Sequence, residues 1–321
     1  MAEKGDDNKN NNESNNAVEQ AATLIQRGEL VAFPTETVYG LGANAYDDKA
    51  VAGIFEAKGR PQFNPLIVHT FSVEEAEKIV HFNARAYKLV KAFWAGPLTL
   101  ILPRKDKRIS YLVSAGLDTL GIRMPSHPIA QRFLRAAKVP VAAPSANISG
   151  TISPTTSSHV KESFKDNPLF VIDGGRSAVG LESTIIELTG DKPVLLRAGF
   201  ITPKQISACL DEEVIISDGN PHKPHSPGQL LSHYAPTLPV RINATSRIGK
   251  EAFLAFGDGF PDADMNLSST GDLKEAAANL FAFLHLLDDK TRYDGIAIAP
   301  IKNEGIGLAI NDRIKRASYP R

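Results

Sequence analysis

The chain contains almost no cysteine and no long apolar run. Of its 321 residues only Cys209 is a cysteine, which excludes an internal disulfide framework and a cysteine-based zinc site. No stretch is apolar enough to span a bilayer and no signal peptide is recognisable, so we expect a cytoplasmic protein with no membrane partner. A GxxxxGK[ST] loop is also missing, which excludes nucleotide binding of the P-loop type.

The charge balance excludes a second group of functions. Lysine plus arginine number 36, as do aspartate plus glutamate, so the net charge attracts the molecule neither to nucleic acid nor to an anionic surface. The hydrophobic fraction of 42% and the charged fraction of 22% are typical of a globular protein. The asparagine-rich residues 1–16 contain almost nothing apolar, and we expect them to form a disordered tail.

Periodicity predicts a mixed architecture in two parts. Residues 17–210 combine helices with many irregularly spaced strands, which indicates a mixed α/β (α+β) sheet rather than a doubly wound one. Residues 211–238 are rich in proline and polar side chains, which is typical of an extended linker. Residues 239–321 alternate strand and helix and predict a small α/β layer domain.

Three polar segments follow or precede predicted strands, where open sheets tend to bind ligands. In the first, FPTETVYGLG (33–42), Thr37 follows a strand, and Gly40 and Gly42 are interpreted as loop glycines with positive φ. The second and third, AKGRPQFNPLIVH (57–69) and PVAAPSANISGTISP (140–154), place cations and hydroxyls between prolines. Such loops suit a polyanion such as a nucleoside triphosphate. Their polar members are Lys58, Arg60, Asn64, His69, Ser145, Asn147, Ser149 and Ser153.

Two arginines stand at the ends of apolar strands. Arg123 precedes Met124-Pro125 and fits either a carboxylate clamp or a surface salt bridge. Arg197 ends an apolar run before Gly199, where a charge is costly unless it has a partner.

Taken in order, these segments resemble the threonylcarbamoyl-AMP synthase family, the YrdC-like enzymes. The resemblance rests on PTETVYGLG, KGRP, NPLIVH, GPLT, RMP, APSANISG, SPT, EST and LLRAG, which cover nearly all of residues 17–210. A motif like SPGQLLSHYAP in the linker is similar to the longer form of the family. The resemblance implies a twisted-sheet catalytic domain (17–210), a linker or lid (211–238) and a smaller Rossmann-like domain (239–321).

The resemblance also implies a reaction and a set of roles. Family members form threonylcarbamoyl-adenylate and pyrophosphate from L-threonine, bicarbonate and ATP with Mg²⁺, the first step of tRNA threonylcarbamoyladenosine synthesis. Lys58 and Arg60 would be catalytic. The ATP-binding positions would be Lys58, Arg60, Asn64, Thr119, Ser145, Asn147, Ser153, Arg197 and Tyr234, and the L-threonine positions Thr37, His69, Arg123, Ala143 and Ser183. Downstream partners would be the tRNA threonylcarbamoyl-transferase proteins.

Several assignments stay open. Glu36 is a candidate base or metal contact, and no residue resembles a covalent nucleophile, so we expect catalysis by positioning and charge stabilisation. His69 is either a threonine ligand or a core histidine. The linker histidines 222, 225 and 233 lack carboxylates at ligand spacing, and we predict no protein metal site. Leu231 stands where the family usually has a second linker tyrosine.

Two alternatives belong to other classes of protein. An RNA-binding module would use a basic surface, and Arg313, Lys315 and Arg316 are predicted to form a basic helix face that is either solvated or a weak tRNA contact. A carbamoyltransferase of the hydrogenase-maturation type embeds a related domain. Those proteins carry cysteine-rich zinc fingers, which a single cysteine excludes.

Overall fold

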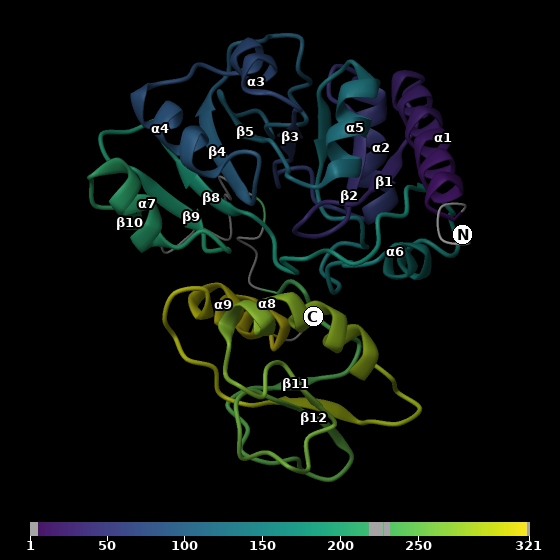
Figure 1. Cartoon of the computed structure of the whole chain (residues 1–321), viewed down its shortest axis with the longest axis vertical. Helices are drawn as coiled ribbons and strands as arrows, with labels where there is room; N and C mark the ends of the chain where they lie inside the picture. Colours follow the sequence, from purple (N-terminus) through teal and green to yellow (C-terminus); the bar gives the residue numbers. More distant parts are fainter. Residues whose placement is uncertain (1–5, 218–226, 228–231, 320–321) are drawn as a thin grey trace.

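The structure is a computed structural model, and it describes residues 6–217, 227 and 232–319, with side chains from residue 15 onward. Two sheets organise these residues (Figure 1). We call the larger sheet with helices α1–α7 the N-terminal unit, and the smaller sheet with α8 and α9 the C-terminal unit. No helix in the described ranges is both long and apolar enough to cross a membrane.

The N-terminal unit is built on a ten-stranded sheet of order β10-β9-β8-β4-β5-β3-β6-β2-β1-β7. Parallel pairs such as β3–β5 alternate with antiparallel ones such as β4–β5, so the predicted mixed α/β class is confirmed. The strands are β1 (Val31–Phe33), β2 (Gly40–Asn44), β3 (Ile67–His69), β4 (Leu98–Pro103), β5 (Thr119–Arg123), β6 (Val141–Ala143), β7 (Phe170–Val171), β8 (Thr184–Glu187), β9 (Val194–Arg197) and β10 (Ile215–Ile216).

The helices of this unit begin and end at recognisable caps. In α2 the Asp47 side chain accepts from the first-turn N–H groups, and Gly59 ends the helix in the left-handed region at φ 58°. Lys58 is therefore the last helical residue, and Arg60 follows in the turn. The helices are α1 (Asp6–Gln26), α2 (Asp48–Lys58), α3 (Val73–Ile79), α4 (Ala84–Phe93), α5 (Pro128–Ala137), α6 (Ser157–Ser163) and α7 (Pro203–Leu210).

The N-terminal segment corrects the predicted disordered tail. Helix α1 begins at Asp6, so residues 6–16 are helical and only residues 1–5 lie outside the described part of the chain. The later turns bury Val18, Ala21 and Ile25 in a cluster with Phe133 of α5. Once that packed segment is helical, adding further turns avoids the cost of nucleation, which explains a helix in a polar sequence.

The segment after Tyr39 corrects a second prediction. Gly40 and Gly42 lie in strand β2 and not in a loop with positive φ. A Cβ at Gly42 would lie 2.8 Å from Val141 Cγ1 and 3.1 Å from a ring carbon of Phe33. These glycines are required by the close approach of neighbouring side chains on the sheet, and the strand continues directly out of the polar loop.

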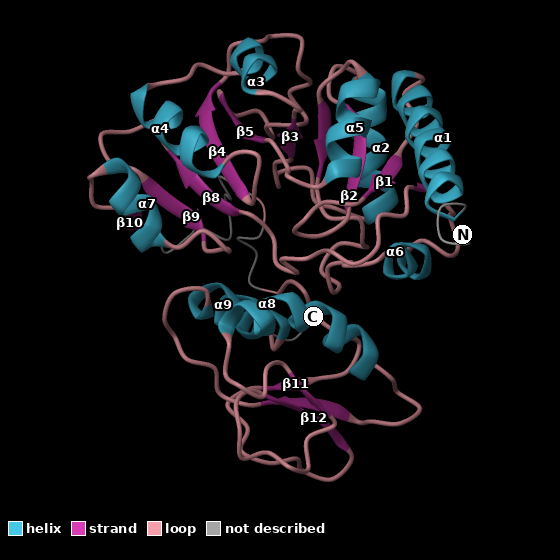
Figure 2. Cartoon of the chain, viewed as in Figure 1, coloured by secondary structure: helices cyan, strands magenta, loops and turns pink. Residues whose placement is uncertain are grey.

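The C-terminal unit contains a parallel sheet of order β11-β14-β12-β13 with two helices on one face (Figure 2). Its elements are β11 (Val240–Arg241), β12 (Glu251–Ala255), β13 (Met265–Asn266), α8 (Leu273–Leu287), β14 (Gly295–Ile298) and α9 (Gly307–Ala317). Both helices lie between this sheet and the N-terminal unit (Figure 1). Val38, Ile152 and Leu181 of the N-terminal unit belong to the same buried apolar cluster as the residues of α8 and α9, so the two units share a core.

Candidate active site

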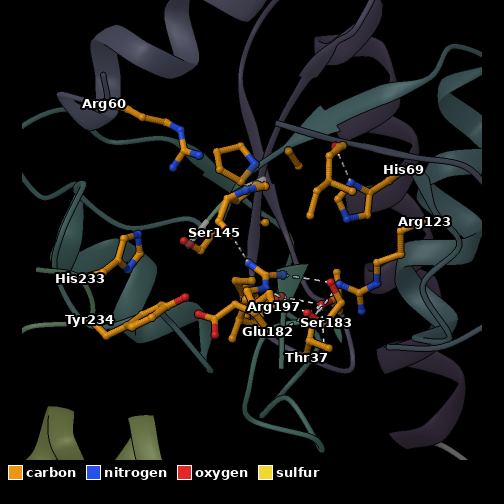
Figure 3. A pocket seen from close by; sticks show the side chains of 18 residues that line it. Thr37, Arg60, His69, Arg123, Ser145, Glu182, Ser183, Arg197, His233 and Tyr234 are labelled. Carbon is orange, nitrogen blue, oxygen red and sulfur yellow. Dashed lines mark hydrogen bonds between the residues drawn. The ribbon is translucent and has the colours of Figure 1, made fainter. Parts of the chain in front are cut away.

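A polar cavity lies where the first and third polar segments meet the strand ends of the large sheet (Figure 3). Nine of the fourteen predicted site residues line it, and the linker residues Pro227 and His233 are added to them. Its lining residues are Thr35, Thr37, Val38, Tyr39, Gly40, Arg60, Ile67, His69, Arg123, Ala143, Pro144, Ser145, Glu182, Ser183, Arg197, Pro227, His233 and Tyr234.

Arg123 is held at the end of β5 by three hydrogen bonds. Its Nη1 donates to Thr37 Oγ1 at 2.9 Å, its Nη2 to Glu36 Oε1 at 2.6 Å, and its Nε to the Gly96 carbonyl at 3.3 Å. The surface salt bridge that the sequence left open is wrong, because both partners are less than 10% exposed. Of the five N–H donors of an arginine, one on each terminal nitrogen is not used within the described residues, and a carboxylate takes such a pair.

Glu36 supports Arg123 and is not placed as a base. One carboxylate oxygen accepts from Arg123 and the other from the Ser126 backbone N–H at 3.0 Å. Glu36 does not line the cavity, so its predicted role as a base or metal contact is wrong. The carboxylate fixes the guanidinium from behind.

His69 lies beside Arg123 on the neighbouring strand β3. Its Nδ1 is 3.1 Å from the Ile67 carbonyl, and the ring packs edge-on against Phe33. Burial, reinforced by the charge of Arg123, lowers the pKa of His69 to about 3. The imidazole is therefore neutral near pH 7, and since the Ile67 carbonyl accepts from Nδ1–H, the Nε2 atom is an acceptor.

Lys58 holds the third polar segment in place. Its ammonium is buried and donates to the backbone carbonyls of Ser145, at 2.7 Å, and Asn147. Ser145 Oγ in turn donates to Asn147 Oδ1 at 2.6 Å, and the Asn147 amide donates to the Thr151 carbonyl at 2.9 Å. Ser145 faces the cavity whereas Lys58 and Asn147 lie behind it, so Lys58 and the Ser-x-Asn signature form one hydrogen-bonded unit.

Arg60 lines the cavity, and Asn64, whose backbone carbonyl it contacts, lies behind it. Arg60 donates to the carbonyls of Asn64, at 3.2 Å, and Pro65, at 3.0 Å, and this wraps the loop around its guanidinium. The Asn64 side chain is completely buried, yet within the described part of the chain neither its Oδ1 nor its Nδ2 has a hydrogen-bond partner. Unpaired buried amides are rare and call for an explanation such as a ligand.

Ser183 and Arg197 form a pair at the start of β8 and the end of β9. Arg197 donates to the Ser183 carbonyl at 3.0 Å and to its hydroxyl at 3.1 Å, and Thr99 lies 2.7 Å from that hydroxyl. Burial lowers the pKa of Arg197 to about 10, and burial likewise lowers the pKa of Arg60 to about 10. Both remain cationic, and burial together with the charge of Arg60 lowers the pKa of Lys58 well below its usual value. An anionic ligand would relieve this excess of positive charge.

The linker contributes His233 and Tyr234. Tyr234 is buried, with φ at 62°. Its ring centroid lies 4.1 Å from that of His233 and 5.4 Å from that of Phe281 in α8. It therefore touches both the cavity and the shared core, and burial raises its pKa. His222, His225 and Leu231 lie outside the described residues.

Two of the predicted positions lie apart from the rest, and two residues were missed. Thr119 begins β5 at the end opposite Arg123 and does not line the cavity, and Ser153 is completely buried with its hydroxyl on Glu182. Ala143 lines the cavity as predicted. Glu182 was missed, although an acid directly before Ser183-Thr184 at a strand start is a visible signal. His233 was treated only as a linker residue.

The donor set does not form a metal cage. The described residues contain no group of three or more histidine, cysteine, aspartate or glutamate side chains that could hold an ion. Of the oxygen donors nearby, the Ser145 hydroxyl lines the cavity and is of the hard type that Mg²⁺ takes, whereas the Asn147 amide oxygen lies behind it and already accepts from that hydroxyl.

The fold and this site define a two-unit protein with an arginine-rich cavity at the strand ends of a mixed sheet, lined in part by Pro227, His233 and Tyr234 of the linker. Residues 23–199 match the Sua5–YciO–YrdC family model, described as "Telomere recombination", and residues 201–318 match the "Threonylcarbamoyl-AMP synthase, C-terminal domain". The chain belongs to the threonylcarbamoyl-AMP synthase family.

Individual relatives are similar to this chain over nearly its whole length. The chain is 41% identical to a threonylcarbamoyl-AMP synthase of Pyrococcus abyssi, over 93% of each protein, and 41% identical to one of Bacillus subtilis, over 95% of this chain and 93% of the relative. The crystal structure of P. abyssi Sua5 complexed with L-threonine superimposes with a TM-score of 0.86, with 40% identity over 94% of both chains.

Proposed function

We propose that this chain is a nucleotidyltransferase that forms threonylcarbamoyl-AMP and pyrophosphate from ATP, L-threonine and bicarbonate, supplying the activated carbamoyl group for a later transfer to tRNA. The observation that carries the proposal is the convergence of Arg60, Arg123 and Arg197 on one cavity that also contains hydroxyls and a neutral histidine. The relatives named for this reaction, and the one solved with L-threonine, support the same assignment.

The side chains divide into two groups by chemistry. Arg123 offers its two unused terminal N–H groups to the threonine carboxylate, while Thr37 and Glu36 fix the orientation of the guanidinium. His69 Nε2 and the Ser183 hydroxyl can accept from the threonine amine or hydroxyl. Arg60, Arg197 and the Ser145 hydroxyl, with Asn64 beyond them, suit the phosphates of ATP, with Mg²⁺ neutralising phosphate charge.

The reaction needs no covalent intermediate on the protein. The threonine amine would add to CO₂ formed from bicarbonate and lose a proton, giving N-carboxythreonine. An oxygen of that carboxylate would attack the α-phosphorus of ATP, and the bond from the α-phosphorus to the bridging oxygen would break to release pyrophosphate. The arginines would stabilise the charge that develops on the α-phosphoryl and pyrophosphate oxygens.

Pyrophosphate release with and without each substrate tests this proposal. We expect release that requires ATP, L-threonine and bicarbonate together, with threonylcarbamoyl-AMP detected by mass spectrometry. Arg123→Lys keeps the charge but loses the planar pair of donors, so we expect the KM for L-threonine to rise about tenfold or more, the size of one charge-assisted hydrogen bond, with little change in the KM for ATP. Lys91→Ala, on the exposed face of α4, is the matched control.

Two outcomes would contradict the proposed function. Pyrophosphate release that does not depend on L-threonine, or a folded chain that releases none, would contradict the synthase assignment. The contact with tRNA and with the downstream transferase stays a prediction. The predicted basic face on α9 is wrong as a three-residue set, because Arg313 is completely buried.

A further inference from the structure

Arg313 of the C-terminal unit reaches across to the N-terminal unit. It lies on α9 and its side chain has no exposed surface. Its Nε donates to Glu182 Oε2 at 3.0 Å, and its Nη1 donates to the Ala198 carbonyl at 2.8 Å and to Asp312 Oδ2 at 2.9 Å. Breaking a buried ion pair leaves an uncompensated charge, so the contact between Arg313 and Glu182 constrains how the two units fit together.

The two segments that Arg313 holds are those that carry cavity residues. Glu182 directly precedes Ser183, and Ala198 directly follows Arg197. Ser183 and Arg197 are hydrogen-bonded to each other and line the cavity. Because Arg313 binds the residues next to Ser183 and Arg197, it constrains the backbone position of both.

Glu182 extends the same contact to the third polar segment. Its Oε1 accepts from the Ser153 hydroxyl, and its carboxylate lines the cavity (Figure 3). A carboxylate exposed to a polyphosphate would repel it unless a cation compensated its charge. Arg313 supplies that cation from behind, as Glu36 does with opposite sign for Arg123.

Other contacts also join the two units near Arg313. A Cβ at Gly180, where φ is 72°, would lie 2.6 Å from Ala278 Cα, so the loop before Glu182 lies directly against α8. Arg176 donates to the Ala278 carbonyl at 2.7 Å, and His285 Nε2 is 3.2 Å from the Ser153 carbonyl. The surface on which Arg313 acts is thus continuous and closely packed.

We propose that Arg313 is a positioning residue of the active site, contributed by the C-terminal unit, which neutralises and orients Glu182 and thereby sets Arg197, through its hydrogen bonds to the adjacent Ser183, for ATP. This inference rests on the proposed function, and it makes the C-terminal unit part of the nucleotide site. The effect of losing Arg313 should fall on ATP and should depend on the charge of Glu182.

A double-mutant cycle separates this role from a structural one. The variants are Arg313→Met, Glu182→Gln and their combination, with Lys315→Ala on the exposed side of α9 as the matched control. Four quantities are measured on the full chain: the Kd for ATP by calorimetry, the KM for ATP, the KM for L-threonine and the urea midpoint. Glutamine keeps an acceptor for Ser153 and removes the charge.

We expect Arg313→Met to weaken ATP binding about tenfold or more, and the double variant to return to within about threefold of Glu182→Gln alone, a coupling of the size found within one network. The KM for L-threonine should change much less. Lys315→Ala should match the wild type. Where Arg313→Met does not fold, Arg313→Lys and the double variant carry the same comparison, because both avoid leaving Glu182 as an uncompensated charge.

The outcomes that overturn the inference are distinct from those that overturn the function. A lower urea midpoint with unchanged ATP affinity would make Arg313 purely structural, and equal losses in the single and double variants would exclude action through the Glu182 charge. Either result with normal wild-type turnover leaves the synthase assignment intact. A wild-type chain that neither binds ATP nor forms the adenylate would overturn both.

Discussion

Asn64→Leu should make the ligand-free protein more stable while weakening its binding of ATP. The Asn64 side chain is completely buried, and neither polar atom of its amide has a partner among the described residues. An unsatisfied buried polar group costs about 1–3 kcal/mol, and replacing it with an apolar group of similar shape removes that cost. Because branching differs between the two side chains, part of the gain is lost to repacking. We therefore expect a net gain of about 1–2 kcal/mol in the free energy of unfolding.

The assay is urea unfolding with and without ATP and Mg²⁺. Without nucleotide the midpoint of Asn64→Leu should lie above that of the wild type, with the same slope. At an ATP concentration about one hundred times its Kd, the wild type gains about 2.7 kcal/mol by mass action, and the variant gains less because its affinity is reduced. The order of the two proteins should therefore approach equality or reverse when ATP is added.

Lower stability of the ligand-free variant would contradict this prediction. If Asn64→Leu is less stable than the wild type without nucleotide, the amide has a partner in the ligand-free protein and is not held ready for a ligand. Asn64→Asp is a useful comparison because it places a carboxylate beside Arg60 and the phosphates, and it should weaken ATP binding further through charge repulsion. Equal ATP affinity in all three proteins would place Asn64 outside the nucleotide site.

Three further predictions follow from other parts of the site and sheet. The folded-state pKa of His69, about 3, lies below the unfolded value of 6.5, so its contribution to stability is complete above pH 6.5 and is lost as the pH falls toward 3. The free energy of unfolding of the wild type should therefore fall between pH 7 and pH 5, and in His69→Asn that fall should be smaller by about 2 kcal/mol, measured by urea unfolding. An unchanged pH dependence would contradict the assignment. Gly42→Ala should cost about 1–3 kcal/mol in unfolding free energy because its Cβ would meet Val141 and Phe33, whereas Gly53→Ala in α2, with neighbours no closer than 3.8 Å, should be neutral or stabilising. Thr37→Val removes the acceptor of Arg123 Nη1 and should raise the KM for L-threonine about five- to tenfold without a matching change for ATP; equal effects on both substrates would show that the contact serves the cavity as a whole.

Local signals in the sequence were sufficient to predict most helices and strands and most of the residues that line the cavity. The starts of helices α5 and α8 carry local signals, because Pro128 stands in the first turn of one and the Asp272 side chain caps the other. The motif positions Thr37, Arg60 and Ser145 face one cavity because each stands in a segment that leaves or enters a strand. What brings them together is the order of the strands, and only the resemblance supplied that.

The errors have a common physical cause, which is that burial depends on partners distant in the chain. Arg313 was predicted to share a basic helix face, either solvated or in weak contact with tRNA, because its helix carries three cations; it is buried by contacts with Glu182, 131 residues away, and Ala198. Gly42 was interpreted as a turn residue, whereas Val141 on a neighbouring strand makes it a packing position. No local pattern contains either fact.

The charges of the site are arranged in two layers, and this arrangement constrains what can bind. Arg60, Arg123 and Arg197 face the cavity, whereas the carboxylate of Glu36 lies behind Arg123. Glu182 is the exception, a carboxylate on the cavity side, and its compensating cation comes from the other unit. A neutral ligand would leave the three guanidinium groups mutually repelling in a desolvated cavity, and a cation would increase that repulsion. A ligand with several negative charges would satisfy all of them together, which is the physical reason for proposing two anionic substrates here, an amino-acid carboxylate at Arg123 and a triphosphate at Arg60 and Arg197.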